Sequence, residues 1–274
     1  MSASFTTAPF LTQTIDGLIS DELIVRIEKF QREVMRTKVV DGLMGPTGPT
    51  FARLYAMAPA IKEDDLFGSS SAVLGATLNT DMLKDRYQKQ FSDVGVDAMI
   101  QLATRLAGDP RVSDVRWAAY MLATTKHETG HTFMPITETG GANYFKKKYD
   151  VEGNNPQNAK DHGNTEPGDG AKYCGRGFVQ LTWKNNYKSL GKKLLLGDQL
   201  VDSPEKALEY DIAFDVMVYG MTNGSFTGVG LGRFINDLKC NYVNARKIIN
   251  ALDKAEDIAA YAEAFEVMLR VALR

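Results

Sequence analysis

Helical spacing of apolar residues dominates the chain after about residue 81, and strand signals are few. Apolar side chains that recur every three or four residues give a helix one buried face. The pattern predicts helices at 96–106, 112–128 and 204–221, and from Tyr242 to the C-terminus with a break near Asp253. Ser203 and Pro204 are typical of a helix start, a cap followed by proline at the first helical position. The predicted fold class is therefore mainly α.

Composition and charge exclude several classes of protein. The 274 residues carry 32 basic and 34 acidic side chains, a formal net charge of −2, so we expect neither nucleic acid nor a membrane surface as partner. The apolar runs fall well short of the roughly 20 residues that span a bilayer. The first 14 residues contain no Lys or Arg and no sustained apolar core, so we expect synthesis in the cytoplasm without a cleaved signal. Cys174 and Cys240 are expected to be free, structural thiols.

One helix ends in an acidic residue with a partly apolar neighbourhood. The 112–128 helix is expected to bury Val115, Ala118, Ala119 and Leu122, and Gly130 is a natural stop after it. Helical spacing places Glu128 near Thr124 and Met121. A carboxyl group desolvated in this way can hold a proton near neutral pH, as a general acid must. The alternative is a solvated glutamate at a helix end, where the helix dipole disfavours an anion.

A second carboxylate follows ten residues later, at Glu138. Hydrolysis of a glycosidic bond needs two carboxylates, which in inverting enzymes lie roughly 6.5–9.5 Å apart to admit a water. Other acids occupy the same Gly- and Asn-rich stretch, which is expected to have little regular structure between 137 and 173. The base could therefore also be one of these residues, namely Asp150, Glu152, Asp161, Glu166 and Asp169.

A third group of residues suits an amide- and hydroxyl-bearing sugar. Gly175 and Gly177 allow the backbone to turn and approach a ligand, and Gln180, Thr182 and Asn186 supply uncharged donors and acceptors. Aromatic side chains nearby could stack on a sugar or could belong to the core; they are Tyr173, Trp183 and Tyr187.

These segments resemble the family 19 glycoside hydrolases, which are chitinases and their phage and bacterial lysin relatives. The segments are 127–130, 173–182 and 185–187, and the tail at 242–250 and 259–262 is similar to the lysin branch. The resemblance implies a lysozyme-like, two-lobed helical fold and single-displacement hydrolysis with inversion. It implies that Glu128 is the general acid, Glu138 the second carboxylate and Thr182 the hydroxyl that helps to hold water. The substrate-binding positions that we assign alongside them are His127, Tyr173, Arg176, Gln180, Asn186 and Asn250.

The N-terminal residues predict a separate small helical domain. Apolar spacing predicts a helix at 21–35 and a shorter one at 50–57, joined by a Gly- and Pro-rich turn. The segments 30–32, 41–42 and 45–46 resemble a small peptidoglycan-binding module of wall hydrolases, although a hairpin that only packs on the catalytic domain is the alternative. We therefore divide the chain into a module with its linker at 1–70 and a catalytic domain at 81–274.

Two other classes of function remain as alternatives. His127, Glu128 and His131 satisfy the H-E-x-x-H pattern of zinc peptidases. That site needs both histidines on one helix face, and a helix end near Gly130 would separate them. The other alternative is a wall-binding protein without activity.

We expect an endolysin-type peptidoglycan hydrolase, or a chitinase on the same fold, that needs no cofactor or metal. The expected partners are peptidoglycan or chitin strands, and the expected state is a monomer. A protein made without a signal peptide reaches the periplasm or the wall only with help, which could come from a holin or a secretion machine.

Overall fold

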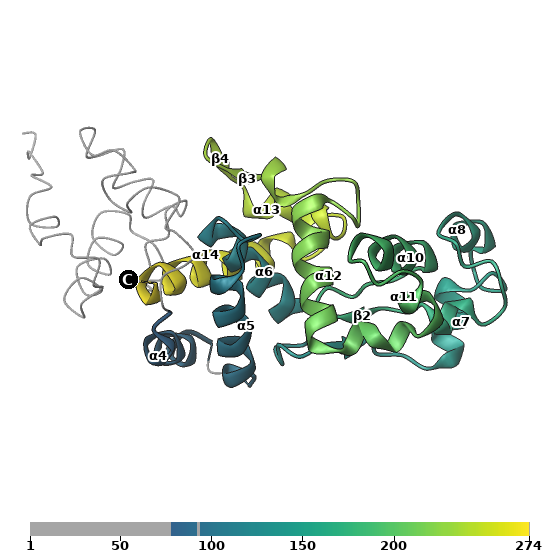
Figure 1. The fold of residues 1–274 in the computed structure, drawn as a ribbon, viewed down its shortest axis with the longest axis horizontal. Helices are drawn as coiled ribbons and strands as arrows, with labels where there is room; N and C mark the ends of the chain where they lie inside the picture. The colour runs from purple at the N-terminus through teal and green to yellow at the C-terminus, as the bar shows by residue number, and fades with distance from the viewer. Residues whose placement is uncertain (1–77, 92–93, 274) are drawn as a thin grey trace, which may run out of the picture.

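The computed structural model describes residues 78–91 and 94–273. Its helices confirm the mainly α class, and its strands are two short antiparallel pairs. The predicted helical module at 1–70 lies outside the described residues. Figure 1 shows helices α4 to α6 and α14 at one end of the described region and α7 and α8 at the other.

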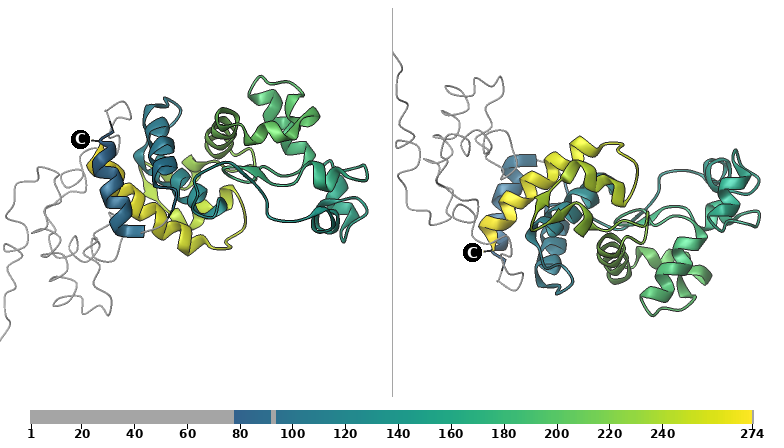
Figure 2. Two further views of the ribbon diagram at one scale, coloured as in Figure 1. Left: turned by 90° about the horizontal axis from the view of Figure 1, so that it is seen from below. Right: turned by 90° about the horizontal axis from the view of Figure 1, so that it is seen from above.

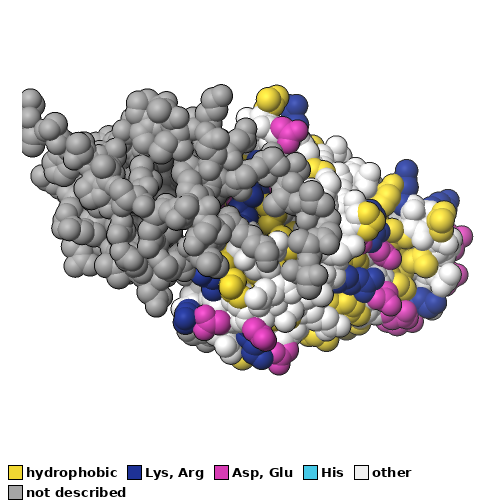
Figure 3. Space-filling view, turned by 60° about the vertical axis from the view of Figure 1, so that its left-hand side comes forward, with side chains coloured by type: hydrophobic (Ala, Val, Ile, Leu, Met, Phe, Trp, Pro, Cys, Tyr) yellow, Lys and Arg dark blue, Asp and Glu magenta, His cyan; other side chains and the backbone are white. Residues whose placement is uncertain are grey.

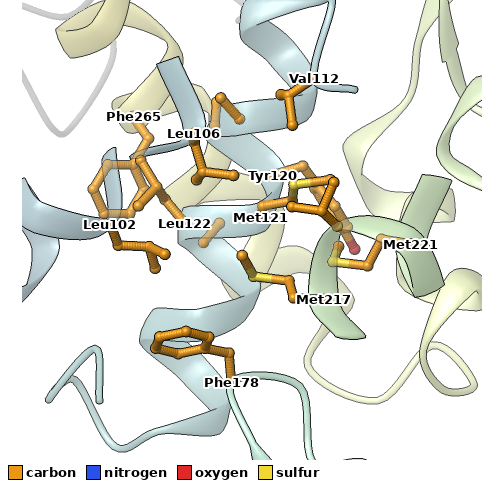
Figure 4. Close-up of a cluster of buried hydrophobic side chains, with 14 of the residues drawn as sticks. Leu102, Leu106, Val112, Tyr120, Met121, Leu122, Phe178, Met217, Met221 and Phe265 are labelled. Carbon is orange, nitrogen blue, oxygen red and sulfur yellow. The ribbon is translucent and has the colours of Figure 1, made fainter. Parts of the chain in front are cut away.

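The larger of two buried clusters is built around helix α6 (Val115–Glu128). Asp114 caps the start of α6, accepting a hydrogen bond from the Arg116 N–H. The four apolar residues predicted to be buried are all at most 1% exposed. Figure 4 shows side chains of α6 meeting those of other helices, among them Leu106, Met217 and Phe265. The surrounding elements are α4 (Thr80–Phe91), α5 (Val96–Gly108), α12 (Tyr210–Asn223), α13 (Tyr242–Ala245) and α14 (Ala255–Ala272).

A smaller second cluster consists of Phe145, Tyr149 and Cys174, with Ala171 and Trp183 packed against it. The helices of this lobe are α7 (Ala142–Tyr149), α8 (Pro156–Asp161), α9 (Asp169–Lys172), α10 (Lys184–Lys193) and α11 (Gln199–Asp202). Strands β1 (Ile136–Thr137) and β2 (Arg176–Gly177) pair antiparallel at its base. In both views of Figure 2 the chain around these strands runs between the α4–α6 helices and α7 and α8. These two groups of helices match the predicted two lobes, and the larger cluster reaches into the second lobe through Tyr187, Leu190 and Leu200.

Three predicted boundaries are wrong. The stretch at 137–173 contains α7, α8 and α9, whose shortness hides their periodicity. The predicted 204–221 helix is a 3-10 turn, η3 (Pro204–Leu208), followed by α12, because Glu209 is extended; Ser203 makes no side-chain cap. The predicted break near Asp253 is confirmed, because α14 starts at Ala255, but the segment before it is only α13 followed by η5 (Arg246–Ile248).

The remaining elements are a 3-10 turn and a hairpin, η4 (Leu231–Arg233), β3 (Ile235–Asn236) and β4 (Lys239–Cys240). Cys174 and Cys240 are both free thiols, as predicted. On the face that Figure 3 presents, dark blue and magenta side chains lie next to each other at several places. No helix in the described part of the chain has the length and apolarity needed to cross a membrane.

Candidate active site

Glu128 is the last residue of α6, and its side chain is only 16% exposed. Its Oε1 accepts a hydrogen bond of 2.7 Å from Nη1 of Arg246, whose side chain is 3% exposed. Arg246 also donates from Nε to the Asp253 carbonyl at 3.0 Å, which fixes the guanidinium. The sequence predicted a partly apolar neighbourhood for Glu128, and the structure adds a buried ion pair to it.

Sequence reasoning missed Arg246 because it lies 118 residues from Glu128 along the chain. A signal was available in the tail that resembles lysins, since Arg246 stands in the middle of it. Asn250, predicted from the same tail, follows η5 and is exposed. Its N–H donates to the Arg246 carbonyl at 3.0 Å. The structure therefore joins the segment of Asn250 to Glu128 through Arg246.

The chain after Glu128 makes a tight turn. Gly130 and His131 have φ of 57° and 70°, and Thr129 Oγ1 donates to the Thr125 carbonyl at 2.7 Å. Because α6 ends at Glu128, His127 and His131 do not lie one helical turn apart on one face. His131 packs instead against the ring of Tyr261 on α14, and His127 is half-buried at the end of α6. This geometry does not support the zinc alternative, and no three potential ligands cluster among the described residues.

Glu138 follows β1, and donors on two elements hold its carboxylate. Oε1 accepts hydrogen bonds from Tyr144 Oη at 3.2 Å, Lys148 Nζ at 2.9 Å and Tyr149 Oη at 2.9 Å. From the described part of the chain, Oε2 accepts one hydrogen bond, a long one of 3.3 Å from the Gly175 N–H. The Glu138 N–H donates to the Gly175 carbonyl at 2.8 Å. The side chain is 17% exposed, so this carboxylate is held firmly and still reachable.

Lys148 and both tyrosines were not predicted. Partial burial opposes the charge of Lys148, but hydrogen bonds to Tyr144, Tyr149 and Glu138 outweigh it and raise the pKa of the ammonium. Burial likewise raises the pKa of the Tyr149 phenol, so both side chains remain donors at neutral pH. A sequence signal existed in the i, i+4 spacing of Tyr144 and Lys148 within a lysine run.

Gln180, Thr182 and Asn186 are linked to each other. Thr182 Oγ1 donates to the Gln180 carbonyl at 2.7 Å, and Asn186 Nδ2 donates to the Thr182 carbonyl at 2.8 Å. Gln180 Nε2 donates to the carbonyls of Ile136 and Gly177, each at 3.2 Å. Because its amide hydrogens are engaged, Gln180 can offer a ligand only its Oε1. That oxygen lies 2.8 Å from the position that a Cβ on Gly175 would occupy. Gln180 and Glu138 therefore both border Gly175.

Two predicted ligand positions have structural partners. Tyr173 is 1% exposed, and its hydroxyl donates to the Val201 carbonyl at 3.1 Å, so the expected stacking face is buried in the core. Tyr187 is fully buried as well. Arg176 lies in β2, and its Nη1 donates to the Lys172 carbonyl at 2.8 Å and to Tyr187 Oη at 3.0 Å. Trp183 is half-buried and stacks on His162 at 4.6 Å.

Two of the other candidate bases, Asp150 and Asp169, are buried and have local partners of their own. Asp150 is 2% exposed and accepts from the N–H groups of Glu152, Gly168 and Gly170. Asp169 is 6% exposed and accepts from two backbone N–H groups and from Lys184. These contacts organise the loop. Glu138 differs because its side chain is more exposed, 17% against 8% for Asp169.

The sequence at residues 77–227, more than half of the chain, matches the family model described as chitinase class I. Chitinase C from Streptomyces griseus HUT6037 is a similar solved structure, 20% identical, covering 70% of this chain and 74% of its own, with a TM-score of 0.45. A bacterial family 19 chitinase is 21% identical, covering 75% and 91%, with a TM-score of 0.40. None of the curated proteins matches the chain. The family match shows that the chain belongs to glycoside hydrolase family 19, the class I chitinase family, and is a glycosidase.

Proposed function

We propose that this glycosidase is an endolysin-type enzyme that cleaves β-1,4 bonds between the amino sugars of peptidoglycan, with inversion. The observation that carries the mechanism is a shared arrangement of the two carboxylates. Oε1 of each is bound to a cation, Arg246 for Glu128 and Lys148 for Glu138. Among the described residues, nothing donates to Oε2 of Glu128, and only the Gly175 N–H donates to Oε2 of Glu138. Each carboxylate therefore has one oxygen fixed and one available.

The two available oxygens suit opposite proton transfers. Oε1 of Glu128 faces a guanidinium, so the proton of the acid form belongs on Oε2, from where it passes to the glycosidic oxygen as the C–O bond breaks. Oε2 of Glu138 takes a proton from the water that attacks the anomeric carbon. Thr182 has already committed its hydrogen to the Gln180 carbonyl, so its hydroxyl oxygen meets that water as an acceptor.

The polar groups around Gly175 suit an N-acetylated sugar. Gln180 can present Oε1 to an amide N–H or a hydroxyl, and Asn186 keeps Oδ1 and one amide hydrogen for a sugar. Chitin and peptidoglycan both carry such groups. Peptidoglycan is favoured by the resemblance of the 242–262 tail to lysins and of the 1–70 segment to a wall-binding module. Chitinase activity is the second candidate, and the family match supports it equally.

The decisive test digests purified peptidoglycan and chitin oligosaccharides in parallel with the wild type and Glu128→Gln. We expect new reducing ends from peptidoglycan that are absent with the variant, and mass analysis of the fragments identifies the bond. Proton NMR of the first product should show the α-anomer, because a single displacement inverts a β-linkage. Products from chitin alone would establish the chitinase instead. Release of peptide termini that EDTA abolishes would support the zinc peptidase instead.

Action at the wall requires delivery, which we propose comes from a membrane-permeabilising partner such as a holin, or from a secretion machine. Expression inside bacteria with and without a holin tests this idea. We expect lysis only when both are expressed, and no lysis when Glu128→Gln replaces the wild type. Lysis by the enzyme alone would show that it crosses the membrane without such a partner.

A further inference from the structure

Helix α7 directs three donors at a single oxygen of Glu138. Tyr144, Lys148 and Tyr149 all lie on this eight-residue helix, and all three donate to Oε1. A carboxylate oxygen has two lone pairs, so three donors fill its capacity to accept. Glu138 therefore has no room for a water on Oε1 while α7 is in place.

The three donors support each other as well as Glu138. Lys148 Nζ also donates to Tyr144 Oη at 2.8 Å and lies 5.2 Å and 4.8 Å from the centroids of the Tyr144 and Tyr149 rings. Such distances are within the range of a cation–π contact. Tyr149 is wedged in turn against Trp183, 4.9 Å between ring centroids, and against Phe145. The small buried cluster of this lobe thus fixes the direction in which the donors point.

The other carboxylate oxygen is kept open by a glycine. The single hydrogen bond to Oε2, from the Gly175 N–H, is long at 3.3 Å. A Cβ at position 175 would stand 3.2 Å from Oε2, so any other residue there would crowd this oxygen. Saturation of Oε1 and the missing Cβ at Gly175 act together to leave Oε2 as the accessible acceptor.

We propose that Lys148, supported by Tyr149, is a positioning residue that aims Oε2 of Glu138 at the attacking water. This inference rests on the proposed role of Glu138 as the base. Water then loses one proton to Oε2 as its oxygen bonds to the anomeric carbon, and the leaving oxygen receives the proton of Glu128. Without Lys148 the carboxylate keeps the neutral donors Tyr144 and Tyr149 on Oε1 but loses the charged one, so its orientation is held less firmly.

The test compares Lys148→Met with Lys146→Met, a matched control on the same helix. Lys146 pairs with Glu152 rather than with Glu138, and its side chain is similarly exposed, 53% against 47%. We expect Lys148→Met to lower kcat by about 10-fold to 100-fold with KM changed less than twofold, since a misplaced catalytic group costs turnover rather than binding. We expect Lys146→Met to match the wild type in both constants.

Two further measurements separate positioning from a merely structural role. Lys148→Arg keeps a cation and a donor and should recover most of kcat. A Tyr149→Phe variant should show a smaller fall in kcat, since it removes one neutral donor and no charge.

The outcomes distinguish this inference from the proposed function. An inactive Glu138→Gln together with an unchanged Lys148→Met would overturn the positioning role and leave the base in place. A fully active Glu138→Gln would remove the base role on which the inference rests. A fall in kcat for Lys148→Met that Lys148→Arg does not rescue would also reject the inference. A wild type inactive on both glycans would refute the proposed function itself.

Discussion

The two carboxylates are held by regions of very different construction. Glu128 ends a helix of the large core, and its cation, Arg246, is 3% exposed. Glu138 lies in a turn beside a cluster of three buried residues, and its cation, Lys148, is 47% exposed. A buried guanidinium with a fixed donor fork suits a group that must not move. The exposed lysine suits a group that must share its surroundings with water, as a base that activates water does.

The largest effect is expected at the acid. Glu128→Gln removes the transferable proton and should lower the rate of reducing-end release by about 10²–10⁴-fold or more. Thr182→Ala, which removes only one contact to water, should cost less. If the glutamine variant kept more than a tenth of the activity, the acid would have to be another residue.

Removal of Arg246 should lower the free energy of unfolding more than removal of Lys148. Arg246→Met leaves Glu128 without its buried partner. We expect the free energy of unfolding to fall by about 3 kcal/mol. This value is at the lower end of the range for breaking a buried ion pair, because the Glu128 side chain is 16% exposed. Lys148→Met removes an exposed pair and should cost at most about 1 kcal/mol. Urea unfolding of both variants measures the difference. Equal losses would mean that burial of the cation does not distinguish the two sites.

A glycine-to-alanine pair tests the crowding around Glu138. A Cβ on Gly175 would stand 2.8 Å from Gln180 Oε1 and 3.2 Å from Glu138 Oε2. Gly175→Ala should therefore lower kcat by up to about 10²-fold, the cost of displacing a reacting group by a small distance. Gly141→Ala is the control, because a Cβ there meets nothing within 4 Å and its φ is −102°. A variant at Gly175 as active as this control would show that the loop accommodates the methyl group.

The sequence predicted the large-core region better than the Glu138 region. The 96–106 prediction differs from α5 by two residues at its end, and the predicted end of the helix at 128 coincides with the end of α6. Long apolar stripes determine these helices locally. Helix α7 buries only Phe145 and Tyr149, so it has no long apolar stripe to distinguish it from a loop. Tyr173 was assigned to the sugar because its neighbours are motif residues, whereas three-dimensional packing places its ring in the core.

Local sequence patterns could not predict the partners of the two carboxylates, because these partners lie far away along the chain. Arg246 meets Glu128 across 118 residues, and Gly175 meets Glu138 across 37. Spacing within one helix or turn cannot report such pairs, which only the packing of α6, β1 and β2 brings together. The family resemblance supplied the roles of Glu128 and Glu138, but the side chains that hold them are visible only in the folded chain.

The acid stability of the region around Glu138 should depend on Asp150. Burial works against the charge of Asp150, but the N–H groups of Glu152, Gly170 and Gly168 outweigh it and hold the pKa of this carboxyl below its ordinary value of 3.8. A carboxyl with a lowered pKa in the fold stabilises it fully above that ordinary value and loses this contribution as pH falls through the lowered one. Asp150→Asn should therefore cost about 1–3 kcal/mol at pH 7.

That cost should begin to shrink once the pH falls below about 4, where the unfolded chain takes up a proton at Asp150 while the fold still resists it. Asp161→Asn, an exposed acid of the same lobe that accepts from Gln157, should be neutral at every pH. Thermal unfolding between pH 3 and 7 measures both variants. A cost for Asp150→Asn that stays constant across this range would mean that the shape of Asp150, rather than its charge, holds the loop. The difference in ionic interactions between the Glu128 region and the Glu138 region would then rest on the Glu138–Lys148 pair alone.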